Sequence, residues 1–526
     1  MRGEIMIKSD YKMAKEKVFA LKKLSLRAQH LDLMAGGTIV LLNAQQANQN
    51  DIYTGYRIIL RSGRRSITAM VDLTNDMVQP GAIGLFHEAW SELKPEKGGM
   101  IEVELTSRPE SIEYIKNKLD GKELDPHQIQ TIIGEVMQNR LSEGEMSAYM
   151  TSCYIRGMSD NEVVGLTNAI VHTGDRFDLK RSPVLDKHCI GGVAGNRTTM
   201  VIVPIMAAAG CYMPKTSSRA ITSAAGTADT METLCQVTLP IDEMVAQVRK
   251  IGACIVWGGA INLASADDKL IKIRNPLSLD PKGVLLASIL AKKKSVGAQY
   301  CIIDIPVGRG VKIQDVHEAR NLAKDFINIG KRLGIQIEAL ITNGENPIGR
   351  GIGPALECRD VLAVLEGSGP VDLRDKSCQM AGTLMELAGK CKKGEGHAIA
   401  QRMIDSKKAL AKFKQIVDAQ GGDSRKLNAH SVPIGSHRFT LKAERPGRIS
   451  HLDSKMLSRL ARAAGAPSDR GAGVYLHCNH GDVVRPGDPL LDLYSESESK
   501  LDLAIKVLKT YEAVELEKVV LDSLRE

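Results

Sequence analysis

Residues 186–210 read DKHCIGGVAGNRTTMVIVPIMAAAG, and the fold of the chain can be worked out from this stretch. A glycine-rich loop leads into a long apolar run that is typical of a buried helix. Glycines let backbone N–H groups approach an anion, and a helix N-terminus carries about half a unit of positive charge. Lys187, Thr198 and Thr199 add an ammonium group and two hydroxyls. The stretch predicts a phosphate-binding loop or, on spacing alone, a tight turn before a packed helix.

Apolar and helical segments alternate on both sides of this stretch, from about residue 183 to residue 430. Such alternation is the mark of an α/β domain. The candidate buried strands are VTLPI (237–241), ACIVW (253–257), YCIIDIPV (300–307) and IQIEALI (335–341).

Three further segments carry polar groups suited to binding. Residues 215–227, KTSSRAITSAAGT, offer hydroxyls and an arginine to phosphate or sugar, or merely cap the next helix. In RNPLSLDP (274–281), Asp280 precedes a proline, the usual place of a helix cap. At the edge of a cleft the same carboxyl group would donate a proton to a leaving base. VGRGVK (307–312) follows an apolar strand, and open α/β sheets bind ligands at such strand ends.

Amphipathic helices precede the α/β part, between residues 109 and 172. Asp125-Pro126 predicts a helix start, because a capping residue stands before proline at the first helical position. Capping boxes in SEGE (142–145) and SDNE (159–162) predict two more helix starts. Apolar residues recur at helical spacing, which indicates a helical bundle or a helical interface.

Both ends of the chain are β-rich. TIVLL (38–42), YRIIL (56–60) and SITAMVDLT (66–74) predict a separate small domain without a visible cluster of ligands or nucleophiles. Near the C-terminus, ERPGRIS (444–450) and residues 473–495 are predicted strands broken by Gly-Asp and Pro-Gly turns. A charged amphipathic helix within residues 503–524 closes the chain or flanks a final strand.

Composition restricts the class of protein. The 526 residues are 43% hydrophobic and 25% charged, which is typical of a soluble globular protein with three or four domains. The net charge of +8 is mild and dispersed, and only 4% of residues are aromatic, which disfavours a nucleic-acid-binding protein. The ten cysteines form no C-x-x-C pair, which favours a reducing cytoplasm over a zinc site or disulfides. We see no secretory signal and no apolar run near the ~20 residues that span a bilayer.

Taken in order, these segments resemble the thymidine phosphorylase family, and most of all its long form with an extra N-terminal domain, which AMP phosphorylase typifies. The resemblance covers nearly the whole chain. It rests on DKHCIGGV (186–193), SSRAITSAAGTAD (217–229), NPLSLDP (275–281) and ASILAKKKSVGA (287–298), with weaker support from residues 108–124 and 480–495.

The resemblance implies a multidomain α/β fold in which a helical domain is hinged to a larger α/β domain, with the active site in the cleft between them. We expect a β-rich N-terminal domain (1–106), a helical domain (107–172 and 263–296), a central α/β phosphate-binding domain (173–262 and 297–436) and a small C-terminal α+β domain (437–526). Family members pair through the helical domain, so a homodimer or a higher homo-oligomer is expected.

Site residues carry over only where the motifs match. Asp280 matches the proposed proton donor. The positions that bind nucleotide in AMP phosphorylase correspond to Gly192, Ser218, Arg219, Ala220, Ile221, Thr222, Ser223, Thr227, Ser288 and Lys312. The positions that hold phosphate correspond to Lys187, Ser217 and Thr227, to which the glycine-rich loop adds Thr198. The positions near the pyrimidine in thymidine phosphorylase correspond to His188, Ser288 and Lys292.

Two departures separate the chain from thymidine phosphorylases. Cys189 stands where those enzymes usually have serine, and residues 218–227 replace their glycine-rich GRGxGHTGGT segment. Lys312 favours a nucleotide, because AMP phosphorylases have a lysine at the matching place and a cation there can reach a second phosphate.

The expected reaction is phosphorolysis of an N-glycosidic bond, in which AMP or another nucleoside monophosphate and phosphate give the base and ribose 1,5-bisphosphate. Inorganic phosphate is the co-substrate, and neither a metal nor an organic cofactor is expected. The alternatives are a thymidine phosphorylase, which forms thymine and 2-deoxyribose 1-phosphate, a phosphoribosyltransferase of the same fold, and a non-enzymatic nucleic-acid-binding protein. A phosphoribosyltransferase needs magnesium held by paired acidic residues, and the sequence shows no convincing pair. We expect small-molecule partners, no nucleic acid and no membrane.

Overall fold

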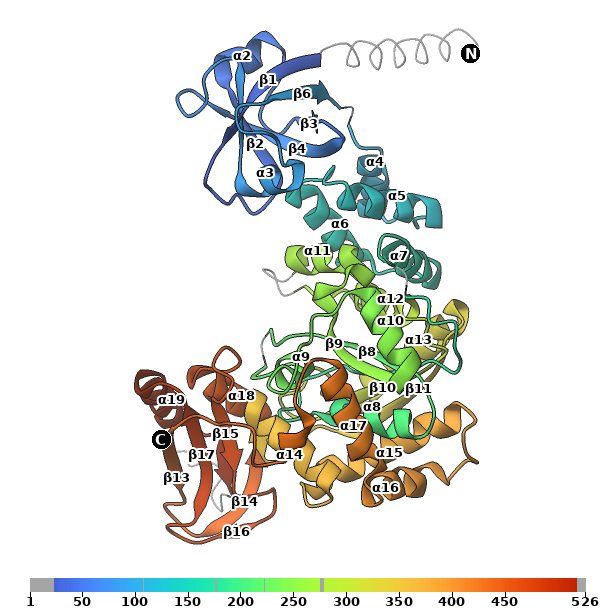
Figure 1. The fold of residues 1–526 in the computed structure, drawn as a ribbon, viewed down its shortest axis with the longest axis vertical. Coiled ribbons are helices and arrows are strands. Elements are labelled where there is room, and N and C mark those ends of the chain that lie inside the picture. The colour runs from blue at the N-terminus through green and yellow to red at the C-terminus, as the bar shows by residue number, and fades with distance from the viewer. Residues whose placement is uncertain (1–22, 107, 176, 222, 275–278, 518–526) are drawn as a thin grey trace, which may run out of the picture. The chain divides into compact units, whose positions relative to one another are not determined.

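The computed structural model describes residues 23–106, 108–175, 177–221, 223–274 and 279–517 (Figure 1). The chain divides into two compact units. One comprises Met1–Thr173 with Ser265–Ala287, and the other comprises Gly174–Ala264 with Ser288–Glu526.

A closed β-barrel opens the first unit, with the strand order β1-β5-β2-β4-β3-β6. Closure removes the free strand edges that invite aggregation. Alternate side chains point inward, so that Ile58, Leu60 and Val71 are fully buried. The barrel elements are β1 (Lys23–His30), β2 (Ile39–Asn43), α2 (Ala44–Gln49), β3 (Arg57–Ser62), β4 (Arg65–Thr74), β5 (Ala82–Leu85), α3 (His87–Leu93) and β6 (Met100–Leu105).

A group of helices completes the first unit. The predicted helix starts are confirmed, because Asp125, Ser142 and Ser159 each cap a helix in a capping box. The buried stripe of α5 is formed by Ile129, Ile132, Ile133 and Val136, as the spacing predicts. The helices are α4 (Ser111–Leu119), α5 (Pro126–Met137), α6 (Glu143–Arg156), α7 (Asp160–His172) and α11 (Ser265–Arg274).

Polar contacts join the barrel to these helices. The Asn139 amide donates to the Thr38 hydroxyl at 3.1 Å. The guanidinium of Arg57, on β3, pairs with Glu145 and donates to the Arg140 carbonyl. The barrel and the helices therefore belong to one compact unit.

The second unit is built on parallel strands. One sheet has the order β11-β10-β7, a second pairs β8 with β9, and a bridge between Val184 and Tyr212 connects β7 to β8. Every pairing among these strands is parallel, so their carboxyl ends share one edge. The strands are β7 (Leu185–Cys189), β8 (Met213–Ser217), β9 (Ala253–Trp257), β10 (Tyr300–Val307) and β11 (Gln336–Asn343).

One predicted strand of this unit is wrong. The segment VTLPI (237–241) is a connection that leads into α10, and Pro240 stands just before that helix. A proline cannot donate to a strand ladder, and its fixed φ suits a helix start instead.

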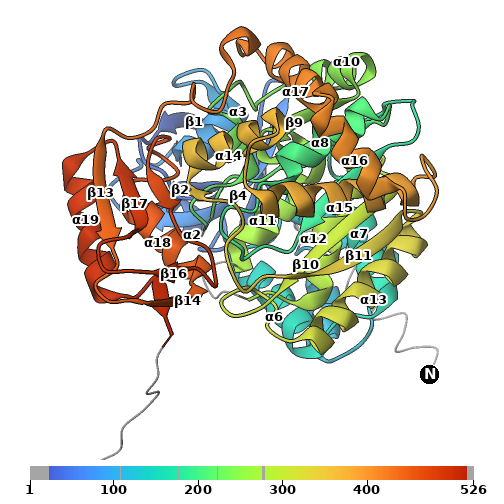
Figure 2. The same ribbon diagram turned by 90° about the horizontal axis from the view of Figure 1, so that it is seen from below.

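Helices cover both faces of these strands. On β7, Lys187 reaches Thr198 of α8 and Asp186 reaches Lys293 of α12, so α8 and the end of α12 lie on opposite faces. Helices α13 and α15 flank β10 and β11 on either side (Figure 2). The helices are α8 (Thr198–Ala208), α9 (Thr227–Met231), α10 (Ile241–Ile251), α12 (Lys282–Ser295), α13 (Val316–Leu333), α14 (Pro354–Glu366), α15 (Val371–Leu387), α16 (Gly396–Asp405) and α17 (Lys408–Ala419), with short 3-10 turns at Gly258–Ala260, Asn262–Ala264 and Ser424–Lys426.

The C-terminal part adds two small antiparallel sheets, with the orders β12-β15-β17-β13 and β16-β14-β18. The helix predicted within residues 503–524 ends at Thr510 and flanks a strand at Val514–Leu516, so the prediction of a helix is wrong for the strand residues, while residues 518–524 lie outside the described residues. The elements are β12 (Gly351–Ile352), β13 (His437–Lys442), β14 (Gly447–Leu452), α18 (Ser454–Ala463), β15 (Gly473–Leu476), β16 (Val483–Val484), β17 (Pro489–Ser495), α19 (Glu498–Thr510) and β18 (Val514–Leu516).

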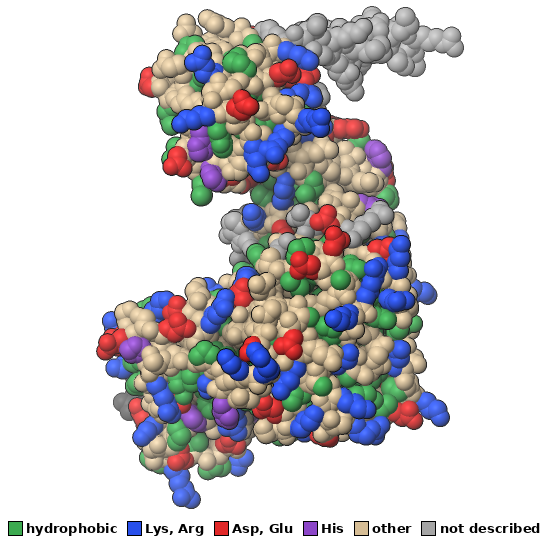
Figure 3. Space-filling view, in the orientation of Figure 1, with side chains coloured by type: hydrophobic (Ala, Val, Ile, Leu, Met, Phe, Trp, Pro, Cys, Tyr) green, Lys and Arg blue, Asp and Glu red, His purple; other side chains and the backbone are tan. Residues whose placement is uncertain are grey.

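Surface charge is dispersed on the face drawn in Figure 3. Lys and Arg side chains lie among Asp and Glu side chains there and do not gather into one band. This distribution agrees with the mild excess of 70 basic over 62 acidic residues.

Candidate active site

The loops that follow β7 and β10 meet at the carboxyl edge of the sheet. Gly192, with φ of +100°, packs so closely that an added Cβ would lie 2.8 Å from the Cα of Val311 and 3.0 Å from the backbone nitrogen of Lys312. Only glycine fits this approach, because a left-handed φ strains other residues. Two residues predicted to bind nucleotide, Gly192 and Lys312, therefore lie side by side.

A buried ammonium group lies at the start of α8. Lys187 is 2% exposed, and its Nζ donates to the hydroxyl of Thr198 at 2.8 Å. The Thr198 hydroxyl in turn donates to Asn196 at 3.1 Å. Burial lowers the pKa of Lys187, although nearby Asp304 opposes that shift. Within the described residues Lys187 forms no ion pair with a carboxylate, so an anion bound here would supply its missing counter-charge.

The neighbouring carboxylate on this face is already paired. Asp304, opposite Cys189 on β10, forms an ion pair with Lys376 at 3.1 Å and accepts a hydrogen bond from Thr342 at 2.7 Å. Asn196 donates to the Cys189 sulfur at 3.3 Å. Burial raises the pKa of Cys189 to about 11, so this residue is a neutral thiol and not a nucleophilic thiolate.

The loop after β8 is folded around one aspartate that the sequence did not single out. Buried Asp229 accepts from the backbone nitrogens of Ala220 and Gly226, at 2.7 and 2.8 Å. Arg219 pairs with Asp229 at 3.1 Å and with Glu232 at 2.7 Å, and its guanidinium lies over the Trp257 ring. The hydrogen bonds that Arg219 donates to Glu232 raise the pKa of Arg219. The charge of Arg219 is thus taken up by protein carboxylates.

The other predicted residues of this loop differ in their surroundings. Ser217, at the end of β8, donates to the Val256 carbonyl at 3.1 Å, and Ser223 donates to the Ala225 carbonyl at 3.1 Å. Ser218 is exposed, and the side chain of Ile221 is 64% exposed. Thr222 lies outside the described residues.

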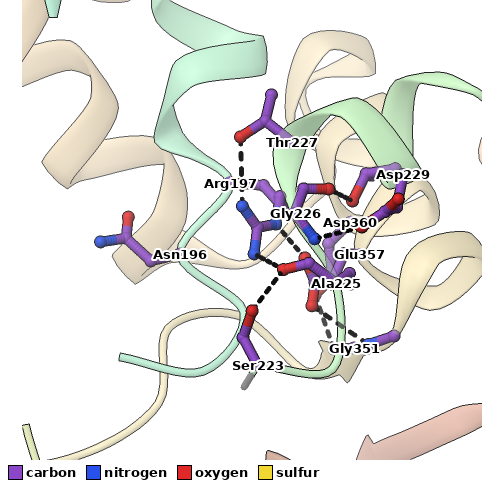
Figure 4. A network of polar contacts seen from close by, with 12 residues as sticks. Asn196, Arg197, Ser223, Ala225, Gly226, Thr227, Asp229, Gly351, Glu357 and Asp360 are labelled. Carbon is purple, nitrogen blue, oxygen red and sulfur yellow. Dashed lines mark hydrogen bonds and ion pairs between the residues drawn. The ribbon is translucent and has the colours of Figure 1, made fainter. Parts of the chain in front are cut away.

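Arg197 connects the loops after β7 and β8 (Figure 4). Its guanidinium donates to the Thr227 hydroxyl at 3.2 Å and to the Ala225 carbonyl at 2.7 Å, and it pairs with Glu357 of α14. Burial raises the pKa of Glu357, although Arg197 opposes that shift. Arg197 was not among the predicted site residues, because its partners lie 28, 30 and 160 residues away in the chain and no local pattern links them.

The opposite face of β7 carries His188 and a second group of charges. Asp186 lies 3.1 Å from the ammonium nitrogen of Lys215 and 2.6 Å from that of Lys293. Burial lowers the pKa of His188 well below its ordinary value, and the nearby ammonium groups of Lys293, Lys215 and Lys292 lower it further. The imidazole is therefore neutral. Ser288, on the same helix as Lys292, is buried.

Asp280 belongs to the first unit, whereas the other predicted site residues belong to the second. It is partly exposed and pairs with Arg274, at the end of α11. The sequence analysis quoted Arg274 but gave it no role.

The described residues include no group of three or more His, Cys, Asp or Glu side chains suited to a metal ion. None of the helices among them has the length and apolar character of a membrane span.

Family models match most of the chain. Residues 112–174 match the helical bundle domain of a glycosyl transferase family, and residues 181–410 match the a/b domain of the same family. Residues 448–515 match the pyrimidine nucleoside phosphorylase C-terminal domain.

Full-length relatives have similar sequences. The chain is 43% identical to the AMP phosphorylase of Pyrococcus furiosus, over 93% of this chain and 97% of the relative. It is 44% identical to AMP phosphorylase 1 of Archaeoglobus fulgidus, over 94% and 98% of the two chains. Among solved structures, anthranilate phosphoribosyltransferase from Thermus thermophilus has a TM-score of 0.51 at 18% identity, covering 58% of this chain and 98% of that one. The last likeness concerns the fold alone.

Proposed function

Since the chain belongs to the family of the AMP phosphorylases, we propose that it cleaves the N-glycosidic bond of AMP or another nucleoside 5′-monophosphate with inorganic phosphate. The products are the free base and ribose 1,5-bisphosphate. The observation that carries the proposal is the buried ammonium group of Lys187, which donates to Thr198 at the start of α8 and has no carboxylate partner among the described residues.

The phosphate is held by groups of the second unit. Lys187, the Thr198 hydroxyl and the N-terminus of α8 supply charge and hydrogen bonds, and the exposed loop residue Gly192 is proposed to donate its backbone N–H group. Thr227 is proposed to donate a further hydrogen bond, and Ser217 to donate another once its bond to the Val256 carbonyl opens. Positioning of a nucleophile in this way lowers a barrier by about 7–11 kcal/mol.

The chemical step is a displacement at the anomeric carbon of the ribose. A phosphate oxygen forms a bond to this carbon while the bond to the base nitrogen breaks, and the bonding electrons leave with the base. The transition state has oxocarbenium character, which the phosphate dianion stabilises. A proton delivered to the departing base completes the reaction.

Residues around His188 are proposed to bind the base. A neutral imidazole both donates and accepts a hydrogen bond, whereas Ser288 and Lys292 offer a hydroxyl and a charge. Asp280 is proposed to donate the proton. Its ion pair with Arg274 must open for this step, because a carboxylate that accepts from a guanidinium has no proton to give.

Lys312 is proposed to bind the 5′-phosphate of the nucleotide. Its backbone lies against Gly192, at the edge where the strands end. Arg219 is the weaker candidate, since Glu232 and Asp229 already take up its charge. A lysine can bind phosphate as a point charge without a fixed hydrogen-bonding plane.

We also propose the four-domain division expected from the sequence, a homodimer or larger homo-oligomer that forms through the helical domain, and a cytoplasmic location. Thymidine phosphorolysis is not favoured, because the relatives named over nearly the whole chain are AMP phosphorylases. A phosphoribosyltransferase has a similar fold, but the relatives that match nearly the whole chain favour phosphorolysis over phosphoribosyl transfer.

The test is release of base from AMP, CMP, uridine and thymidine, with and without phosphate and with and without EDTA. We expect adenine from AMP only when phosphate is present, and we expect EDTA to change nothing. Loss of activity in EDTA that magnesium restores would contradict the phosphorylase assignment. A preference for thymidine over every nucleotide would contradict the substrate class.

A further inference from the structure

Three buried charged side chains form a cluster on the His188 face of β7. Asp186 of β7, Lys215 of β8 and Lys293 of α12 are 0%, 5% and 2% exposed. The two Asp186 oxygens lie 3.1 Å from the Lys215 nitrogen and 2.6 Å from the Lys293 nitrogen. Asp186 also accepts from the backbone nitrogen of Lys187 at 2.7 Å, and Lys215 donates to the Thr216 carbonyl at 2.6 Å. We call these three residues the Asp186 cluster.

Stability alone does not explain the Asp186 cluster. Two ammonium groups share one carboxylate, so a net positive charge stays buried. Taking ions out of water carries a large penalty, and well-packed apolar residues often replace buried ion pairs without loss of stability. Apolar side chains such as Ile255 of β9 and Ile303 of β10 fill paired positions on the adjacent strands. Retention of a costly charged group in such surroundings points to a functional role.

The cluster touches the elements that carry the proposed base-binding residues. Asp186 and His188 alternate on β7 and so share a face. Lys293 is adjacent to Lys292 on α12, about one turn beyond Ser288. The short contact between Lys293 and Asp186 holds the end of α12 against β7, and Lys215 extends the same contact to β8.

We propose that Asp186 is a positioning residue for recognition of the base, which through Lys293 and Lys215 fixes Ser288 and Lys292 of α12 relative to His188. The proposal rests on the proposed function of the site and deepens it. Asp186 does not touch the substrate in this role, and its effect on the reaction passes through α12. Lys187, which contacts Thr198 of α8, lies on the opposite face of β7, so phosphate binding stays largely independent of the cluster.

The first experiment compares Asp186→Asn with the double variant Asp186→Asn/Lys293→Met. The single variant leaves two buried ammonium groups without a carboxylate, and we expect a lower melting temperature. The double variant removes one of these charges and regains most of that stability. If the cluster positions α12, the double variant nevertheless shows at least a tenfold higher KM for AMP and a 10²-fold lower kcat/KM, whereas its KM for phosphate changes less than threefold.

Two further variants serve as controls. Lys293→Arg keeps the charge at the end of α12 and is expected to retain most of the activity with AMP. Glu162→Gln breaks a buried ion pair of comparable burial, at 2.7 Å from Lys118 in the first unit. It is expected to lower the melting temperature and to leave kcat/KM unchanged at temperatures where the protein is folded. All assays are run well below the melting temperatures, with the fold checked by circular dichroism.

Recovery of both stability and activity in the double variant would overturn the proposal and make the cluster purely structural. Equal losses for AMP and phosphate would overturn it as well. The parent protein tests the proposed function separately, since it must release adenine from AMP with phosphate. If the parent releases no adenine, ligand-induced shifts in melting temperature still test the positioning role. AMP must raise the melting temperature of the parent and not that of the double variant, while phosphate must raise that of both proteins.

Discussion

The substitution Lys187→Met separates a phosphate-binding lysine from a structural one. It removes the ammonium group and keeps an unbranched side chain in a 2% exposed position. The lost hydrogen bond to Thr198 and the lost Coulombic attraction to Asp304 destabilise the fold, but the buried ammonium group no longer has to be desolvated. Since these effects oppose each other and Lys187 has no carboxylate partner among the described residues, we expect the free energy of unfolding to change by less than about 1 kcal/mol.

Lys376→Met is the matched control. It also removes an ammonium group, on a half-buried side chain, but it leaves Asp304, fully buried, without its ion-pair partner at 3.1 Å. Removal of one partner of a buried pair costs about 3–5 kcal/mol. We expect the low end of that range, because Thr342 and Asn196 still donate hydrogen bonds to Asp304.

Phosphate affinity gives the second measurement. A hydrogen bond to a charged group contributes about 1.5–3 kcal/mol, so Lys187→Met should raise the dissociation constant of phosphate by about 10- to 10²-fold. At a phosphate concentration of about 100 times the parent's Kd, the parent gains about 2.7 kcal/mol in urea unfolding, and the variant gains only about 0.4–1.4 kcal/mol. Equal stabilisation of both proteins by phosphate, or a destabilisation by Lys187→Met as large as that by Lys376→Met, would refute the reasoning.

Three other predictions concern single side chains. Asp280→Asn should lower kcat by about 10²-fold and change the free energy of unfolding by less than about 1 kcal/mol. Near-normal turnover of this variant would contradict the proton-donor role. Lys312→Ala should lower kcat/KM for AMP and CMP by about 10- to 10²-fold and spare uridine, which a substrate panel checks. Burial lowers the pKa of Lys215 to about 8 from 10.5, so its unfolded form binds more protons between these values. The parent should therefore gain stability relative to Lys215→Met between pH 8 and pH 10.5, and parallel melting curves that show no such gain would contradict the lowered pKa.

Local signals predicted the elements well. Capping boxes at Ser142 and Ser159 fixed helix starts because the cap and its partner lie three residues apart. The strands ACIVW and YCIIDIPV were predicted because short apolar runs fit a sheet covered on both faces. The segment VTLPI has the same apolar character, but Pro240 begins a helix there. The wrong prediction rested on hydrophobicity alone and did not take into account that Pro240 favours a helix start.

The charged contacts of the site were harder to predict. Asp186 and Lys293 are 107 residues apart, and Arg197 and Glu357 are 160 residues apart, so no local pattern pairs them. A partial signal was present nonetheless. Asp304 stands in the apolar run CIIDIP, and a carboxylate within a buried strand must have a partner. A buried Asp304 would have predicted a cationic partner, although the sequence does not show that this partner is Lys376.

The order of residues in β7 places the two proposed binding roles of this short motif on opposite faces of the strand. Side chains alternate along a strand, so Lys187 and Cys189 face α8 while Asp186 and His188 face α12. The two faces balance charge in opposite ways. Lys187 has no carboxylate partner among the described residues, whereas Asp186 is shared by two ammonium groups, which add to the effect of burial in lowering the pKa of His188. A register slip of one residue would exchange these faces and place the Asp186 carboxylate where phosphate is proposed to bind. The identity of each residue in this strand therefore depends on which face of the sheet its side chain occupies. The bridge to β8 and the pairing with β10 hold the register that sets these faces.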